Sequence, residues 1–199
     1  MSLDEYKLVL VSVFLVLVLV AASPTLSMVI DWPAGERFTE LWVLGPGHMA
    51  EGYPFDVREN MSYSVFLGMS NRMGGLEYYV AFVKFRNQTE PLPNATTGEP
   101  SIVTSSFEYR VFLSAGEVWE KNVTFSFSGV SLEGDMCRVS YLVVDGFSSF
   151  VNKTATWDAA NKGYYFQVFF ELWRYNATTS VFEYHNRFVS LWLNMTATV

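Results

Sequence analysis

The sequence predicts an all-β fold: a two-sheet antiparallel Ig-like β-sandwich of about eight strands, preceded by one N-terminal transmembrane helix. Three observations lead to this prediction. Aromatic residues make up 17% of the 199 residues, and aromatic side chains fit a pleated, half-buried surface. Apolar and polar residues alternate with a period of two in one segment after another, as in half-buried strands. One apolar run near the N-terminus is long enough to cross a bilayer.

The apolar run extends over Leu8–Ile30, 23 residues without an ionisable side chain. A helix of this length spans roughly 30 Å, the thickness of a bilayer core. A cleaved signal peptide is the alternative, because the small residues Ala21–Ser23 follow the strongest apolar stretch. Asp4 and Glu5 beside Lys7 do not form the positive region that signal peptides favour, so we expect a retained anchor. The expected parts are a transmembrane anchor, a juxtamembrane linker and an extracellular β domain, over residues 1–30, 31–37 and 38–199.

Eight segments downstream read as strands. They lie near residues 38–44, 62–70, 79–86, 107–113, 123–128, 137–143, 164–175 and 187–195. The clearest pattern places Val123, Phe125 and Phe127 on one face and Thr124 and Ser126 on the other. Between strands, residues 87–106 contain three prolines and are predicted to form a long exposed loop. Residues 156–163 are predicted to hold one helical turn, stopped by a glycine.

Seven of the ten asparagines open an N-x-S/T triplet. Because Ser and Thr occupy 32 of the 199 positions, chance predicts about 1.6 such triplets. This excess predicts that the β domain carries N-linked glycans, with the N-terminus in the cytoplasm and the C-terminal domain outside the cell. The predicted glycosylation sites are Asn60, Asn87, Asn94, Asn122, Asn152, Asn176 and Asn194.

Composition argues against several classes of function. The formal net charge is −7 with a pI near 4.8, which disfavours a nucleic-acid partner, because phosphates attract basic surfaces. Cys137 is the single cysteine and cannot form an intramolecular disulfide. With two distant histidines, it shows no zinc-ligand spacing. We therefore expect no metal site and no cofactor.

Few residues are candidates for catalysis. His48 and His185, the only histidines, lie in expected loops or turns and are interpreted as exposed polar residues rather than members of a hydrolytic triad. The loop acids lack a calcium-loop pattern and are interpreted as solvated turn residues; they are Asp135, Asp145 and Asp158. Three strand acids are candidates for a glycoside-hydrolase pair, which needs two carboxylates facing each other; they are Glu108, Glu171 and Glu183. We therefore expect that this protein is not an enzyme.

Aromatic residues occupy the outward register of the last two strands. Tyr165, Phe169, Trp173 and Tyr175 alternate with inward apolar residues, and Trp192 joins them from the final strand. A partner surface is therefore predicted at Phe169, Trp173, Tyr175 and Trp192, because large rings left in water favour association. The alternative is that a neighbouring loop covers them.

The two ends of the domain carry a family resemblance. The opening FTELWVLGPGHMAEGYP and the closing FFELWRYNATTSVFEYHNRFVSLWLNMT resemble the archaeal membrane-protein family known as domain of unknown function sixteen-sixteen. In that family such segments bracket an extracytoplasmic β domain, which the resemblance places at about Phe38–Thr196. No catalytic residue is assigned in the family, so none is carried over.

These observations give one expectation of function and two alternatives. We expect a membrane-anchored, N-glycosylated archaeal cell-surface protein that is a non-catalytic structural or accessory subunit of a larger envelope assembly, with membrane lipid, glycans and partner subunits as its contacts. The first alternative is a carbohydrate-binding or carbohydrate-processing domain, which a concave site lined by Trp or Tyr and carboxylates would favour. The second is a filament subunit.

Overall fold

A computed structural model describes residues 3–29 and 36–196. The chain divides into two units, Met1–Arg37 and Phe38–Val199, and each is described by itself. The first contains one helix, α1 (Leu3–Val29), which continues through Pro24. Among the described residues, no helix is both long and apolar enough to cross a membrane, so the transmembrane prediction for Leu8–Ile30 is not confirmed. Ile30 and most of the predicted linker lie outside the described residues.

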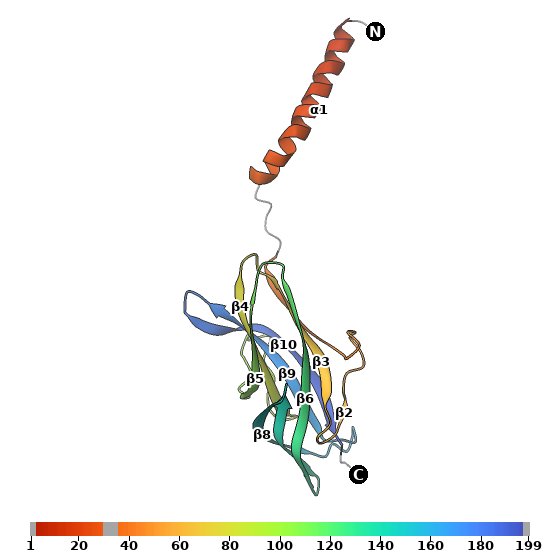
Figure 1. The fold of residues 1–199 in the computed structure, drawn as a ribbon, viewed down its shortest axis with the longest axis vertical. Helices are drawn as coiled ribbons and strands as arrows, with labels where there is room; N and C mark the ends of the chain where they lie inside the picture. The colour runs from red at the N-terminus through yellow and green to blue at the C-terminus, as the bar shows by residue number, and fades with distance from the viewer. Residues whose placement is uncertain (1–2, 30–35, 197–199) are drawn as a thin grey trace. The chain divides into compact units, whose positions relative to one another are not determined.

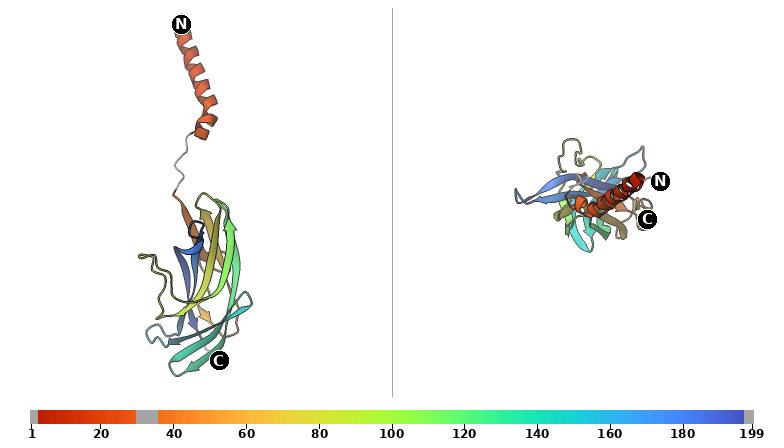
Figure 2. Two further views of the ribbon diagram at one scale, coloured as in Figure 1. Left: turned by 90° about the vertical axis from the view of Figure 1, so that its left-hand side faces the viewer. Right: turned by 90° about the horizontal axis from the view of Figure 1, so that it is seen from above.

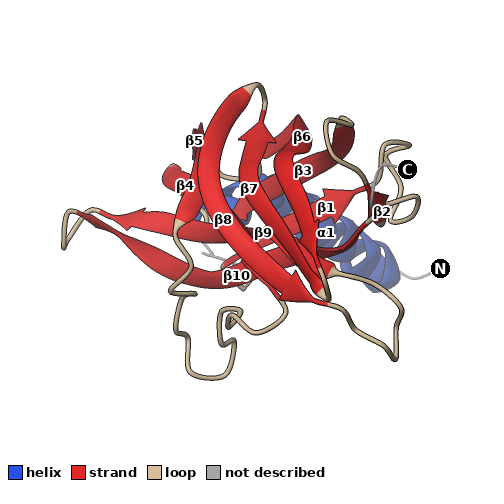
Figure 3. Cartoon of the chain, turned by 90° about the horizontal axis from the view of Figure 1, so that it is seen from below, coloured by secondary structure: helices blue, strands red, loops and turns tan. Residues whose placement is uncertain are grey.

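The second unit is a sandwich of two five-stranded sheets (Figures 1 and 3), which confirms the all-β, two-sheet prediction. The first sheet has the order β1 (Phe38–Leu44), β3 (Tyr63–Arg72), β6 (Val118–Glu133), β7 (Met136–Val144) and β8 (Phe147–Thr156). The second has the order β2 (Asp56–Val57), β10 (Val181–Met195), β9 (Tyr165–Asn176), β4 (Glu77–Asn87) and β5 (Ser105–Leu113). All pairings are antiparallel except that of β2 with β10.

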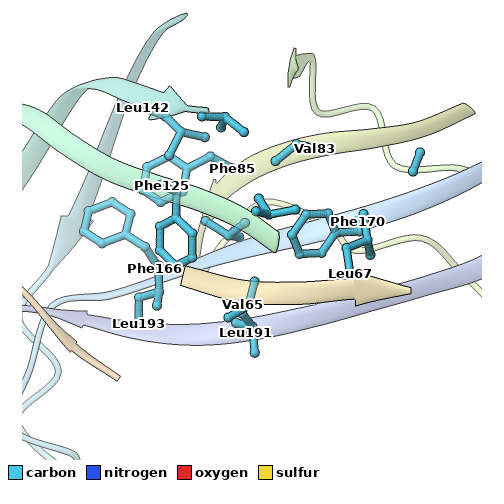
Figure 4. Close-up of a cluster of buried hydrophobic side chains, with 14 of the residues drawn as sticks. Val65, Leu67, Val83, Phe85, Phe125, Leu142, Phe166, Phe170, Leu191 and Leu193 are labelled. Carbon is cyan, nitrogen blue, oxygen red and sulfur yellow. The ribbon is translucent and has the colours of Figure 1, made fainter. Parts of the chain in front are cut away.

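The core lies between the facing sides of the two sheets (Figure 4). Val65, Leu67 and Phe125 project from the first sheet, and Phe85 and Phe170 from the second, all at most 2% exposed. These are the inward positions that the period of two predicts for their strands. Gly68 makes room on the outer face of β3 for the Trp42 ring, because a Cβ there would lie 2.1 Å from Trp42 Cε2.

The alternation of β7 changes register, against the prediction. Cys137 and Val139 point inward as expected, but the next buried residues are Leu142 and Val144, and Tyr141 is 41% exposed. The pairing of β7 with β8 is irregular at the same place, because Val139 to Tyr141 of β7 lies opposite the longer stretch Lys153 to Phe150 of β8.

Three other local predictions need correction. Strands β2 and β8 were not predicted, because β2 has only two residues and β8 is rich in Ser, Thr, Asn and Lys. Residues 156–163 contain the predicted single turn only at its end, where the Lys162 N–H donates to the Asp158 carbonyl at 2.7 Å, because Thr156 still belongs to β8. The segment expected to be a linker before the last strand belongs largely to the β9–β10 hairpin, because β10 begins at Val181.

A buried polar chain joins five strands at the end where the chain enters the sandwich. Thr39 Oγ1 lies 2.9 Å from both Tyr79 Oη and His185 Nε2. Tyr79 Oη donates to Asn71 Oδ1, and Asn71 Nδ2 donates to the carbonyl of Leu113 at 2.7 Å. Strands β1, β3, β4, β5 and β10 therefore meet through side-chain hydrogen bonds, which a buried polar group requires.

The outer face of the second sheet is partly buried under the long loop between β4 and β5, residues 88–104, here named the covering loop (Figure 2). Lys84 forms an ion pair with Glu171 on the neighbouring strand. Lys84 Nζ donates to the carbonyl of Ser101 at 2.9 Å, and the Ser101 N–H donates to Glu171 Oε1 at 2.7 Å. The loop was expected to be wholly exposed, yet Ser101 and Val103 are 7% and 6% exposed.

We predict that Glu171→Ala destabilises the fold by about 3–5 kcal/mol, because it leaves the Lys84 ammonium buried without its counter-charge. Glu108→Ala is the matched control: its partner Arg110 is on the surface, and such pairs contribute about 0–1 kcal/mol. Urea unfolding measures both. The double variant Lys84→Met/Glu171→Met should be more stable than Glu171→Ala. Equal losses for Glu171→Ala and Glu108→Ala would contradict the assignment.

The free energy of unfolding should fall as the pH drops from about 6.5 to 4, because of His185. Burial, assisted by the charges of Arg174 and Arg187, lowers the pKa of His185 to about 4, whereas an unfolded histidine titrates near 6.5. The unfolded state therefore binds the proton first, and the stability present above pH 6.5 is lost towards pH 4. In pH-dependent urea unfolding, His185→Gln should flatten this range, and an unchanged slope in this variant would contradict the assignment.

Candidate functional site

The four residues predicted as a partner surface do not form one surface. Phe169 has no exposed area, so it is not part of any such surface; its pairing partner Lys84 is in contact with Ser101 of the covering loop. Trp173 is half-buried and packs edge-on against Phe82, with ring centroids 5.8 Å apart. Tyr175 and Trp192 are at opposite ends of the β9–β10 pair. Trp192 is paired with Gln167, eight residues before Tyr175, a separation of about 26 Å along the strand.

Tyr175 belongs to a cluster of four rings, here named the hairpin aromatic cluster: Tyr78, Phe112, Tyr175 and Phe182. Tyr78 stacks on Phe112 with centroids 4.0 Å apart and planes at 8°. Phe182 contacts Tyr78 and Tyr175 edge-on, at 5.0 and 5.4 Å. The Arg110 guanidinium carbon lies 5.2 Å from the Phe182 ring centre. The cluster holds its own rings in place, yet Phe112 remains 62% exposed.

The cluster is located near the point where the chain enters the sandwich. Phe38, the first residue of β1, pairs with Arg72, the last residue of β3, and β4 begins five residues later. Sequence analysis identified only Tyr175 of the four rings. Phe112 has the outward register of its strand, which was a usable signal, whereas Phe182 was in a segment interpreted as a linker.

Trp192 lines a cleft of about 340 Å³, here named the Trp192 cleft. Its lining residues come from four parts of the chain: Phe55, Gln88, Asp158, Asn161, Tyr165 and Trp192. The Tyr165 and Trp192 rings meet at 86° with centroids 6.4 Å apart, and Phe55 lies 6.1 Å from Tyr165. Trp192 is 46% exposed. This volume falls within the usual range of small-molecule sites, about 300–1,000 Å³.

The polar groups of the cleft are one carboxylate, two amides and a phenol. Asp158 accepts hydrogen bonds from the Asn161 side chain at 2.8 Å and from the backbone N–H groups of Asn161 and Ala160. The Asn161 hydrogen bonds lower the pKa of Asp158 from its ordinary value, so it is ionised and an acceptor at neutral pH. Tyr165 Oη donates to the carbonyl of Asn161 at 2.6 Å. The turn is therefore held in shape before any ligand arrives.

A cation, Arg86, lies against the Trp192 ring and is not one of the residues that line the cleft. The Arg86 guanidinium carbon lies 5.6 Å from the ring centre, and Arg86 is 6% exposed. Its Nε donates to Gln167 Oε1 at 2.5 Å, and it also donates to the carbonyl of Glu90. Arg86 thus connects the ring to the covering loop.

The candidate catalytic residues are apart from one another. His48 lies 3.1 Å from Glu120, whereas His185 contacts Thr39. Glu108 pairs with Arg110, Glu171 is buried against Lys84, and Glu183 accepts hydrogen bonds from Asn176 and Thr179. Asp145 was interpreted as a solvated turn acid, but its carboxylate accepts hydrogen bonds from Tyr109 Oη at 2.8 Å and from the Thr124 N–H. It thus links the two sheets. Burial raises the pKa of the Cys137 thiol to about 11.

Among the described residues, no group of three or more His, Cys, Asp or Glu side chains has a metal-site arrangement. In particular, the three loop acids lie in three different environments. Asp135 is exposed, Asp145 is hydrogen-bonded between the sheets, and Asp158 lines the Trp192 cleft.

The seven glycosylation candidates divide into two groups. Asn60, Asn94, Asn122 and Asn152 are exposed. The other three are half-buried, and their side-chain amides donate hydrogen bonds: Asn87 to Thr154, Asn176 to Glu183 and Asn194 to Asp56. Asn194 also accepts the Tyr164 N–H, and Asn87 Oδ1 accepts hydrogen bonds from Thr89 and from the Glu90 N–H.

Solved structures with some similarity to this chain share little sequence with it. A β-glucosidase from Listeria innocua matches 81% of this chain with 12% identity and a TM-score of 0.40, and the match spans 16% of that enzyme. A mutant of that enzyme in complex with laminaribiose matches 82% with 13% identity and a TM-score of 0.40, again over 16% of its chain. The C-terminal domain of wzt matches 83% with 8% identity and a TM-score of 0.36, over 81% of that domain.

Comparison with curated proteins finds no match. A family model does match the chain, over residues 33–168. This range contains β1 through the first residues of β9. Because the match extends over more than half of the sequence, the chain belongs to the family described as Domain of unknown function (DUF1616).

Proposed function

We propose that this protein is a membrane-tethered, N-glycosylated β-sandwich of the archaeal cell surface, and that it is a non-catalytic accessory or structural subunit of a larger envelope assembly. The tether and the location rest on the apolar residues Leu8–Ile30 and on the excess of glycosylation triplets. The immunoglobulin-like character of the sandwich stays a prediction. The archaeal assignment rests on the family resemblance of the two ends of the domain.

The observation that carries the accessory role is the hairpin aromatic cluster. Phe112 is 62% exposed and Val181, beside Phe182, is 52% exposed. Burying one such side chain against a partner yields about 1.5–3 kcal/mol. Aromatic side chains and arginine are the residues most enriched at protein interfaces, and Arg110 lies over this cluster. A protein subunit with a complementary apolar surface is therefore the proposed partner.

Carbohydrate processing has less support than this role. The three candidate carboxylates contact separate partners, and Glu171 is fully buried in an ion pair. An acid and a base in glycoside hydrolysis must instead flank one bond, about 5–9.5 Å apart. This argument does not apply to carbohydrate binding without hydrolysis, because binding requires no such pair of carboxylates.

We predict that Phe112→Ala and Phe182→Ala leave the chain folded but release it from its native assembly. Phe150→Ala is the matched control, since Phe150 is 68% exposed and packs edge-on against Tyr141 on the other sheet. The measurement is affinity purification of the tagged full chain from native membranes, followed by native gel analysis. Wild-type protein that runs as a lone monomer, or equal release by Phe150→Ala, would refute the proposed interface.

Glycan occupancy should follow the two groups of asparagines. We expect the four exposed sites, Asn60, Asn94, Asn122 and Asn152, to be modified in the native host. The three half-buried sites, Asn87, Asn176 and Asn194, should be less modified, because their side-chain amides donate hydrogen bonds within the fold. Glycopeptide mass spectrometry of native protein measures each site. An intact mass equal to that of the bare polypeptide would remove the main support for an extracellular location.

A further inference from the structure

We propose that the Trp192 cleft binds a neutral pyranose ring of a glycan, with the sugar stacked on Trp192 and its hydroxyl groups hydrogen-bonded to Asp158 and Gln88. This inference is independent of the accessory role, because the cleft and the hairpin aromatic cluster are at opposite ends of the β9–β10 pair. The same sheet would then have two binding surfaces of different chemistry.

The aromatic residues of the cleft suit a ligand with an apolar face. Trp192 is 46% exposed, Phe55 is 47% exposed, and Tyr165 stands at 86° to the Trp192 ring. A pyranose offers C–H groups on one face and hydroxyl groups around its edge, so it can contact a flat ring and polar side chains together. Ligand sites of this kind combine aromatic walls with a few fixed polar groups.

The polar residues of the cleft suit hydroxyl groups. Asp158 is an ionised acceptor oriented by three hydrogen bonds from its own turn. The Gln88 side-chain amide makes no hydrogen bond to any residue that the structure describes, and it offers both donor and acceptor atoms. Its backbone carbonyl lies 3.4 Å from the Arg86 guanidinium, which fixes the residue at the start of the covering loop.

The charge of the cleft selects a neutral ligand. Its lining residues include Asp158 and no Lys or Arg, and Arg86, whose guanidinium carbon lies 5.6 Å from the Trp192 ring centre, is only 6% exposed. The whole chain carries a formal charge of −7. A carboxylated or phosphorylated sugar would therefore be repelled in the cleft, where no cation faces it.

The geometry of Trp192 is set before binding. Its ring contacts both the Arg86 guanidinium and the Tyr165 ring, and the Asp158 turn is closed by internal hydrogen bonds. Little conformational entropy would be lost on binding, which favours affinity in a shallow site.

The test is a titration of the full chain, produced without glycans and kept in a detergent without a sugar headgroup. The probes are the methyl glycosides of glucose, galactose and mannose and methyl glucuronide, and saturation-transfer NMR detects binding. At least one neutral glycoside should bind, and methyl glucuronide should bind more weakly. Trp192→Ala should weaken binding roughly tenfold or more, the loss typical of a truncated aromatic anchor, and Trp192→Phe should restore part of it.

Two further variants separate a local effect from a loss of fold. Gln88→Ala preserves the N-x-T triplet and removes no hydrogen bond of its side chain within the described residues, so it should weaken binding several-fold without lowering the melting temperature. Phe112→Ala is the matched aromatic control and should bind as wild type does. Binding by none of the neutral glycosides, preference for the glucuronide, or equal affinity of wild type and Trp192→Ala overturns the proposal. Self-association through Trp192 without sugar binding also overturns it.

Discussion

The buried ion pair between Lys84 and Glu171 is the constraint on which the outer surface of this domain depends. Both residues face away from the sandwich core, where a sheet normally meets water, yet they are 5% and 0% exposed. Removing two charges from water is costly unless further hydrogen bonds satisfy them. Here Ser101 supplies those bonds through its backbone N–H and carbonyl. The covering loop is therefore part of the fold, because without it the Lys84 ammonium and the Glu171 carboxylate would lose their hydrogen bonds to Ser101.

This arrangement determines which aromatic rings remain available to partners. Phe169, paired with Lys84 in the middle of the sheet, is buried, whereas rings are exposed at both ends of the same sheet: Phe112 at one end and Trp192 at the other. The covering loop also forms part of the wall of the Trp192 cleft, through Gln88. Gln88 is two residues after Arg86, whose guanidinium carbon lies 5.6 Å from the Trp192 ring centre. The buried middle of the sheet thus separates the hairpin aromatic cluster from the Trp192 cleft. The strand register alone predicts one continuous aromatic surface in their place.

The inward half of the fold was predictable, because it depends on a local and repeated signal. Alternation identified Phe125, Phe170 and their neighbours as core residues, and each is buried. The signal fails where the pairing departs from regular geometry, as at the irregularity between β7 and β8, where Tyr141 turns outward. It fails again in β8, whose polar residues form an edge strand. The burial of Phe169 could not be predicted, because it depends on contacts with a loop distant in sequence. The cleft is similar, since Phe55, Gln88, Asp158 and Trp192 come from four distant segments.

Membership in a family of unknown function leaves the chemistry to be argued from the surfaces themselves. The two exposed aromatic groups differ in what surrounds them. The hairpin aromatic cluster consists of four mutually packed rings with a cation over one of them, an arrangement that offers area but no cavity. The Trp192 cleft offers few rings but a concave shape and an oriented carboxylate. An extended apolar surface suits another protein, and a concave site with fixed acceptors suits a small polyhydroxylated ring. Because the covering loop separates the two, the proposed partner subunit and the proposed glycan would contact different surfaces of this domain.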